Sequence, residues 1–128
     1  MEEKSDYQIS TSVNEEILEI VISGEITKET ADRKHAEVVN LVRAISPKAL
    51  LLDIRALKRP SDQDRIAEVY FRVRSRPPEI RKTPSAVVAL TEDTAYKTFY
   101  ETTAANVNHS ITFFSDIDAA RAWLRGML

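Results

Sequence analysis

The chain has 128 residues, of which 43% are hydrophobic and 30% are charged, which is typical of one domain that folds around its own core. Its formal net charge of −2 argues against a dedicated nucleic-acid-binding protein, which is usually strongly basic. The absence of cysteine excludes disulfides, thiolate metal sites and cysteine nucleophiles. The two glycines, Gly24 and Gly126, are too few for a glycine-rich phosphate-binding loop.

The first residues and the length of the apolar runs bear on the cellular location of the protein. Residues 1–6 are acidic and no apolar stretch of signal-peptide type follows them, so we expect a flexible tail there and a single domain over residues 7–128. The longest strictly apolar runs, residues 49–52 and 86–90, are far shorter than the roughly 20 residues that cross a bilayer. The sequence therefore predicts a soluble cytoplasmic protein.

The first half of the chain predicts two strands, a helix and a third strand. Residues 7–14 alternate between apolar and polar, as in a strand with one wet face, and residues 17–23 are rich in β-branched side chains. Gly24 closes this second strand, and Thr27 is suited to cap a helix that ends at Ser46-Pro47. Residues 49–54 are almost continuously apolar, which is typical of a strand covered on both faces.

The second half predicts three helices and two strands. Ser61 is suited to cap a helix that Pro77-Pro78 ends, and a charged connector leads to a short buried strand at residues 85–90. A helix from Thr91, a strand at residues 111–114 and a helix capped by Asp116 follow. The order ββαβαβαβα predicts an α/β domain with a mostly parallel five-stranded sheet, an antiparallel first edge strand and four helices.

Three acidic residues lie at or just beyond the carboxyl ends of predicted parallel strands, namely Asp53, Asp93 and Asp116. Open α/β sheets often bind ligands at this edge, so a magnesium site of the receiver type is one hypothesis. The strand at residues 111–114 carries no lysine, and helix capping accounts for Asp93 and Asp116. We therefore predict no metal site and no cofactor, with Asp53 bonded to nearby backbone N–H groups.

No catalytic constellation is visible in the sequence. His35 falls on the apolar stripe of the first predicted helix, and His109 lies in a predicted turn that we expect to be exposed to solvent. Neither histidine has a partner at the spacing of metal ligands, and no nucleophile elbow of the Gly-x-Ser-x-Gly type occurs. These residues predict a protein that is not an enzyme.

The middle of the chain is basic. Residues 55–82 contain nine Lys or Arg and four Asp or Glu, a local charge of +5, whereas the remainder carries −7. One interpretation is a solvated helix surface that includes Arg72, Arg74 and Arg76. The other is a patch that attracts an acidic protein partner or, peripherally, anionic lipid.

The large aromatic side chains also allow two interpretations. They can line a cavity for an apolar ligand or fill an ordinary core, and core packing is the commoner role of such residues. The set comprises Tyr70, Phe71, Phe99, Tyr100, Phe113, Phe114 and Trp123.

Three phrases, together with the predicted order of elements, resemble a known family. They are residues 24–27 (Gly-Glu-Ile-Thr), residues 50–53 (Leu-Leu-Leu-Asp), and residues 114–116 (Phe-Ser-Asp) with residues 122–124 (Ala-Trp-Leu). Over roughly residues 7–124 the chain resembles STAS domains, and especially the SpoIIAA-like (STAS/SEC14-type) bacterial proteins of uncertain function. The resemblance implies an α/β fold that binds partner proteins, as anti-sigma-factor antagonists do, rather than catalysing a reaction.

The regulatory feature of that family is a phosphorylatable serine in an Asp-Ser-Ser-Gly-like phrase after the third strand. The matching stretch here, residues 59–64, has one serine, Ser61, and lacks both the serine pair and the glycine. A match without gaps places Asp62 near the phosphoacceptor position. The incomplete motif therefore does not favour phosphorylation of Ser61, which stays a hypothesis. From the resemblance we take only the expected position of the regulatory loop.

These observations together predict a non-enzymatic regulatory or protein-interaction module. The alternative is a protein that binds a small apolar or lipid-like ligand, as the SEC14 part of the resemblance implies, and a homodimer is compatible with either. We expect the partner or ligand to meet the loop that follows the third strand. The predicted contact residues are Asp53, Lys58, Arg59, Ser61, Asp62 and Arg65.

Overall fold

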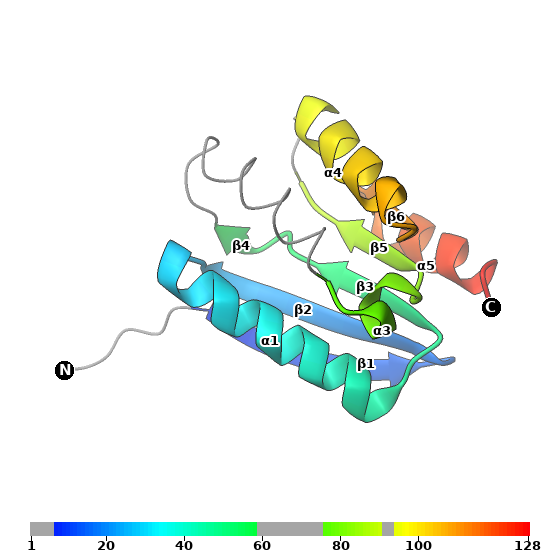
Figure 1. Cartoon of the computed structure of the whole chain (residues 1–128), viewed down its shortest axis with the longest axis horizontal. Coiled ribbons are helices and arrows are strands. Elements are labelled where there is room, and N and C mark those ends of the chain that lie inside the picture. The colour runs from blue at the N-terminus through cyan, green and yellow to red at the C-terminus, as the bar shows by residue number, and fades with distance from the viewer. Residues whose placement is uncertain (1–6, 59–75, 91–93) are drawn as a thin grey trace.

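The structure is a computed structural model that describes residues 7–58, 76–90 and 94–128, and its central feature is one six-stranded sheet (Figure 1). The spatial order is β1-β2-β3-β5-β6, and β4 pairs with β2. β1 is antiparallel to β2 and every other pairing is parallel, which confirms the predicted α/β sheet. The strands are β1 (Tyr7–Asn14), β2 (Ile17–Glu25), β3 (Ala49–Asp53), β4 (Leu57–Lys58), β5 (Ser85–Val88) and β6 (Ile111–Phe114).

The predicted number of five strands was wrong, because β4 adds a sixth. β4 has two residues, too few to show an alternating pattern. Gly24 and Glu25 of β2 pair with it, and the carbonyl of Lys58 accepts a hydrogen bond from the N–H of Ile26 at 2.9 Å. The chain just after β3 is thereby fastened beside the carboxyl end of β2.

Local sequence explains the start of the sheet and the first helix. Glu15 and Glu16 form the turn between β1 and β2 with φ of 55° and 69°, the left-handed values that a two-residue hairpin turn requires. Thr27 caps α1 (Lys28–Ile45) in a reciprocal capping box with Thr30, and Ser46 ends the helix at φ 52°. The predicted cap and stop of this helix are confirmed.

The connector before β5 contains a helix that the sequence did not predict. Residues 78–81 form α3 (Pro78–Arg81), with Pro77 as its N-cap and Pro78 in its first turn. Pro78 thus begins a helix, because proline fits the first helical position, where its missing N–H has no partner to lose. The predicted helix that begins at Ser61 lies outside the described residues, as do residues 1–6 and Asp93.

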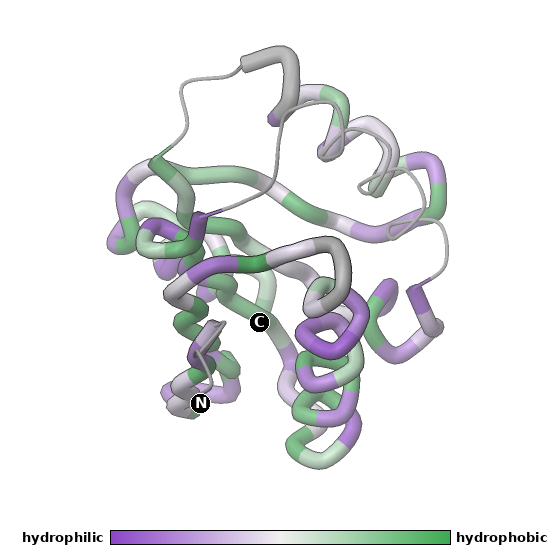
Figure 2. Tube along the Cα trace, turned by 90° about the vertical axis from the view of Figure 1, so that its left-hand side faces the viewer, coloured by the Kyte–Doolittle hydropathy of each residue, from purple (hydrophilic) through white to green (hydrophobic). Residues whose placement is uncertain are grey.

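Helices cover both faces of the sheet (Figures 1 and 2). On one face, α1, α3 and α4 (Thr94–Asn106) pack on alternate residues of the central strands, among them Ile20, Leu50 and Val87. On the opposite face, α5 (Ile117–Arg125) packs on the intervening residues, among them Leu51 and Val88. Figure 2 shows both hydrophobic and hydrophilic residues along the coiled segments, as expected for amphipathic helices with one side on the sheet.

The described aromatic side chains mainly fill these two cores. Tyr100 and Phe113 meet edge to face with ring centroids 5.0 Å apart, and Phe99 packs against the same cluster. Phe114 and Trp123 pair at 5.7 Å on the α5 face. Tyr70 and Phe71 lie outside the described residues. None of the helices in the described ranges has the length and apolar character to span a membrane.

Candidate functional site

The predicted contact residues begin at the carboxyl end of β3, and two of them, Asp53 and Lys58, are described. Asp53 is buried on the α5 face, whereas the side chain of Lys58 in β4 is exposed. No contact joins the two side chains. Arg59, Ser61, Asp62 and Arg65 lie outside the described residues, so their roles stay predictions.

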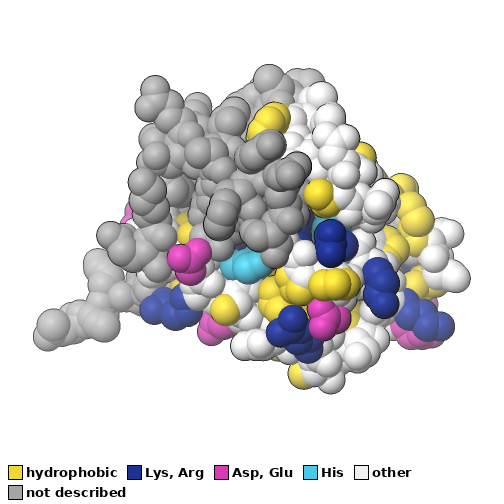
Figure 3. All heavy atoms as spheres, viewed as in Figure 1, with side chains coloured by type: hydrophobic (Ala, Val, Ile, Leu, Met, Phe, Trp, Pro, Cys, Tyr) yellow, Lys and Arg dark blue, Asp and Glu magenta, His cyan; other side chains and the backbone are white. Residues whose placement is uncertain are grey.

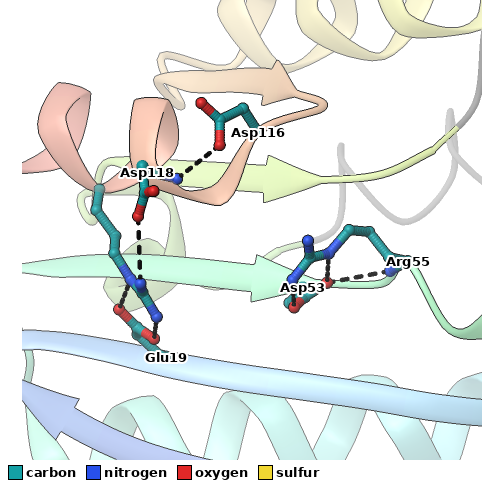
Figure 4. Close-up of polar contacts among 6 residues, drawn as sticks. Glu19, Asp53, Arg55, Asp116 and Asp118 are labelled. Carbon is teal, nitrogen blue, oxygen red and sulfur yellow. Dashed lines mark hydrogen bonds and ion pairs between the residues drawn. The ribbon is translucent and has the colours of Figure 1, made fainter.

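Asp53 forms a bidentate ion pair with Arg55 (Figure 4). The guanidinium donates from Nε to Oδ1 at 2.9 Å and from Nη2 to Oδ2 at 2.7 Å, and the backbone N–H of Arg55 donates to Oδ1 at 3.2 Å. Hydrogen bonding to Arg55 lowers the pKa of Asp53 despite its burial. The predicted backbone bond is present, and the guanidinium is an additional partner that the sequence analysis missed.

A second ion pair lies on the same face of the sheet. Glu19, in the middle of β2, is 7% exposed and accepts two hydrogen bonds from Arg121 of α5, at 2.8 Å and 2.9 Å. Asp118, one turn earlier on α5, lies 3.6 Å from the same guanidinium (Figure 4). The pair fastens α5 to β2. Sequence analysis missed it because its members are 102 residues apart.

The acidic residues at the strand ends have structural partners. Asp116 caps α5 by accepting the N–H of Asp118 at 3.1 Å, as predicted. Asp53 is paired with Arg55. Within the described ranges, no three His, Cys, Asp or Glu side chains come together as metal ligands.

His109 is buried, and its predicted exposure to solvent was wrong. It is 2% exposed and follows Asn108, which has a left-handed backbone at φ 62°. Its backbone N–H donates to the carbonyl of Ala104 at 2.9 Å, just beyond the end of α4. Burial, together with the charge of Arg76, lowers the pKa of His109 to about 4.

The hydrogen bonds of His109 define its tautomer. Arg76 has donors only, so the contact of its Nη1 with Nδ1 at 3.4 Å makes Nδ1 the acceptor. Nε2 must then carry the hydrogen, and it lies 3.1 Å from the carbonyl of Thr83 and 3.0 Å from Oγ of Ser85. His109 is therefore neutral with its proton on Nε2.

The contact between Ser85 and His109 is structural rather than nucleophilic. A histidine that activates a serine needs an unprotonated nitrogen facing the hydroxyl, whereas Nε2 here carries a proton. Oγ of Ser85 itself donates to the carbonyl of Thr83 at 3.0 Å, and Ser85 is 1% exposed. This arrangement holds the start of β5 beside the turn before β6.

Arg76 lies against this group, which does not fit the solvated helix surface, one of the two interpretations that the sequence allowed; Arg72 and Arg74 lie outside the described residues. The guanidinium of Arg76 donates to the hydroxyl of Tyr100 and stands 5.5 Å from the centre of that ring, a cation–π geometry. The residue is half-buried. In the part of the chain that the structure describes, no carboxylate forms an ion pair with Arg76.

A cavity of about 60 Å³ lies beside Arg76, between the sheet and the helices α1, α3 and α4. Aliphatic side chains of the strands and of α1 form most of its described wall, and Arg76, Tyr100, Ser85 and His109 meet there as a polar corner. His35 of α1, half-buried on the predicted apolar stripe, also lines it. The aromatic set thus contributes Tyr100 to a cavity, while the other described members of the set fill the core.

Comparison with known proteins identifies the fold. Over 94% of this chain and 95% of the other, the structure is similar to an anti-sigma factor antagonist from Mycobacterium paratuberculosis, with a TM-score of 0.60 and 21% identity. It is also similar to an uncharacterised DUF3478-family protein with a SpoIIAA-like fold from Shewanella loihica, with a TM-score of 0.59, 15% identity and 97% and 98% of the two chains covered. No family model and no curated protein matches the sequence. The chain has a SpoIIAA-like, STAS-like fold, as its sequence phrases predicted.

Proposed function

We propose that this chain is a non-enzymatic regulatory module that acts by binding another protein. The observation that carries the proposal is the similarity of fold, along 94% of the chain, to an anti-sigma factor antagonist. Fold alone does not define function, so the proposal also draws on a candidate contact surface. That surface is the loop of residues 58–63, with Asp53 at its base and Arg65 in the predicted helix that follows.

The location of the loop supports a contact role. It leaves the carboxyl end of β3, the edge at which open α/β sheets present their sites. Pairing of β4 with β2, and the hydrogen bond from the N–H of Gly24 to the carbonyl of Ala56 at 3.2 Å, place the base of the loop beside the start of α1. Lys58 is exposed there. A rigid base with an exposed basic residue suits a binding loop.

The charge of the loop suggests an acidic partner surface. Lys58, Arg59 and Arg65 lie in the basic middle of a chain that is otherwise acidic. Complementary charge accelerates association and favours one partner over others, and salt screens it. The proposed partner is therefore a protein with an acidic binding face.

Charge reversal tests this function. Tagged wild-type protein, a loop variant (Lys58→Glu, Arg59→Glu, Arg65→Glu) and a control variant (Lys48→Glu, Lys82→Glu, Lys97→Glu) are used to isolate partners from the source cells. Native mass spectrometry then gives the mass of what each retains. We expect one protein to be retained by the wild type and the control and lost by the loop variant, with an affinity that falls as salt rises. Equal retention by all three, or retention of anionic lipid vesicles alone, would contradict the proposal.

Ser61 is proposed to act chiefly as a helix cap in this loop. Ser61→Ala should cost about 1 kcal/mol of unfolding free energy, whereas Ser61→Asp should cost little, because aspartate also accepts the N–H bonds of a helix start. Both variants should bind the isolated partner as the wild type does. Loss of binding in Ser61→Asp alone, at unchanged stability, would instead favour a phosphorylation switch.

A further inference from the structure

The cavity beside Arg76 combines an apolar wall with two basic residues, Arg76 and, on α1, Lys34. Its wall includes Ile22 of β2, Leu50 of β3 and Val87 of β5, all buried. Figure 3 shows the molecule from the side of α1 and α3, where hydrophobic side chains (yellow) are bordered by Lys and Arg (dark blue). An apolar cavity with a few convergent polar groups is the usual form of a small-molecule site.

Among the described residues, no carboxylate lines the polar corner of the cavity. Tyr100 and neutral His109 contact the guanidinium of Arg76 through Nη2 and Nη1, which occupies two of its five N–H groups. No described carboxylate pairs with it. By contrast, the partly exposed arginines Arg55 and Arg121 each hold a carboxylate through two hydrogen bonds. An arginine without such a partner, beside a cavity, is suited to bind an anion.

The neighbours of Arg76 hold it in place for that role. The ring of Tyr100 lies 5.5 Å from its guanidinium carbon, and Tyr100 is itself packed on Phe113. Nε2 of His109, on the side of the ring away from Arg76, contacts Thr83 and Ser85. The guanidinium is therefore oriented before any anion arrives, which reduces the entropy lost on binding.

Size and wall chemistry define the anion. A cavity holds about one water for each 10–15 Å³ of such volume, so 60 Å³ suits a ligand of roughly four to six non-hydrogen atoms. Phosphate would bury several oxygens against aliphatic side chains, which is costly. A carboxylate presents two oxygens to one guanidinium and leaves its alkyl group for the apolar wall.

We propose that the cavity binds a short aliphatic carboxylate of about the size of isobutyrate, with its carboxylate on Arg76 and its alkyl group against β2, β3 and β5. This small-molecule site is independent of the proposed protein-binding loop. Binding at Arg76 requires no loop residue, and the loop variant described above should bind the carboxylate normally.

The test compares isobutyrate with its neutral isostere isobutyramide at constant ionic strength. Saturation-transfer NMR and the melting temperature are followed for the full chain. We expect isobutyrate to bind and to raise the melting temperature in a saturable way, and isobutyramide to bind at least tenfold more weakly. Acetate should bind more weakly because it fills less of the wall, and octanoate because it exceeds the cavity.

Two variants and a control locate the site. Arg76→Gln should weaken isobutyrate binding at least tenfold, and Leu52→Phe, which places a ring in the cavity while keeping Arg76, should weaken it as well. Arg43→Gln, which removes an exposed arginine paired with Glu79, should leave binding unchanged. If Arg76→Gln does not fold, the Leu52→Phe variant and the comparison of isobutyrate with isobutyramide still test whether the anion binds in this cavity.

Three results would overturn the proposal. Equal binding of isobutyrate and isobutyramide would mean that the charge of Arg76 is not used. Equal effects of isobutyrate and chloride would indicate an adventitious ion only. Tighter binding of octanoate or of lipid vesicles than of isobutyrate would point to a lipid-like ligand and contradict the size argument.

Discussion

The two faces of the sheet differ in how their buried charged side chains are paired. On the α5 face, two carboxylates in neighbouring strands, Glu19 and Asp53, each receive two hydrogen bonds from an arginine (Figure 4). On the face covered by α1, α3 and α4, Arg76 meets only neutral groups among the described residues, Tyr100 and His109. Among the described residues, these buried carboxylates are each paired with an arginine on one face, whereas Arg76 has no carboxylate partner beside the cavity on the other.

This difference separates structural polar groups from candidate binding groups. Burial of a charge is costly unless an opposite charge or several hydrogen bonds compensate it. The paired residues of the α5 face meet this condition internally, so they serve to hold the fold together. The charge of Arg76 is compensated only by a tyrosine ring, a neutral histidine and partial exposure to solvent. An anion that binds there would therefore stabilise this charge further.

At pH 7, the largest effect should come from breaking the pair of Glu19 and Arg121. Arg121→Leu leaves the Glu19 carboxylate buried without its cation and should lower the free energy of unfolding by about 2–3 kcal/mol, below the full cost of a buried pair because Arg121 is partly exposed. Urea denaturation at pH 7 measures it. Arg125→Leu on the same helix removes an exposed arginine 3.9 Å from Glu15 and should change stability by less than about 0.5 kcal/mol. A similar loss in both variants would mean that the burial of Glu19 has no special role.

An effect that is absent at pH 7 should appear on the other face when pH is lowered. With the folded-state pKa of His109 at about 4 and the unfolded value at 6.5, only the unfolded chain takes up this proton between those values. Stability is unaffected by His109 above pH 6.5, falls as pH drops to 4, and loses about 3 kcal/mol in total at 1.36 kcal/mol per unit. Denaturation from pH 7.5 to 4 should show a shallower fall in His109→Gln than in the wild type. Parallel curves would contradict the burial of neutral His109.

The smallest effect should follow loss of the unpaired arginine. Arg76→Gln removes a charge that has no carboxylate partner in the described chain, so its cost at pH 7 should stay below about 1 kcal/mol. It should also lessen the acid sensitivity described above, because Arg76 contributes to lowering the pKa of His109. Differential scanning calorimetry at pH 7 and pH 5 measures both. A loss as large as that of Arg121→Leu would place Arg76 among the structural ion pairs and remove the contrast between the faces.

Features encoded in a few adjacent residues were predicted correctly. The strand at residues 7–14, the cap at Thr27, the stop at Ser46 and the cap at Asp116 all appear in the structure, although the alternation in burial along that strand is limited to residues 7–10. Each depends on hydrogen bonds or side-chain periodicity within one turn or one strand, so the local sequence contains the whole cause. The order of these elements then restricted the fold to one parallel sheet with helices on its faces.

The short elements were missed because they have little local signal. β4 forms because its two residues pair with Gly24 and Glu25 at the carboxyl end of β2. α3 forms because Pro77-Pro78 begins a helical turn. The same proline pair is compatible with ending one helix and with beginning another. The second role is observed, with Ile80 of the new helix packed into the core, whereas the residues that would test the first role lie outside the described part of the chain.

The sequence by itself determined the α/β class and the order of the longer strands and helices in the described part of the chain, because local periodicity and caps set them. Short segments such as residues 24–27 and 50–53 carry the resemblance to STAS domains. Only the tertiary structure decided which charges are paired and which histidine is buried. Glu19 meets Arg121 across 102 residues, and Arg76 meets His109 across 33. Such contacts depend on how strands and helices stack in space, which leaves no trace in the spacing of residues along the chain.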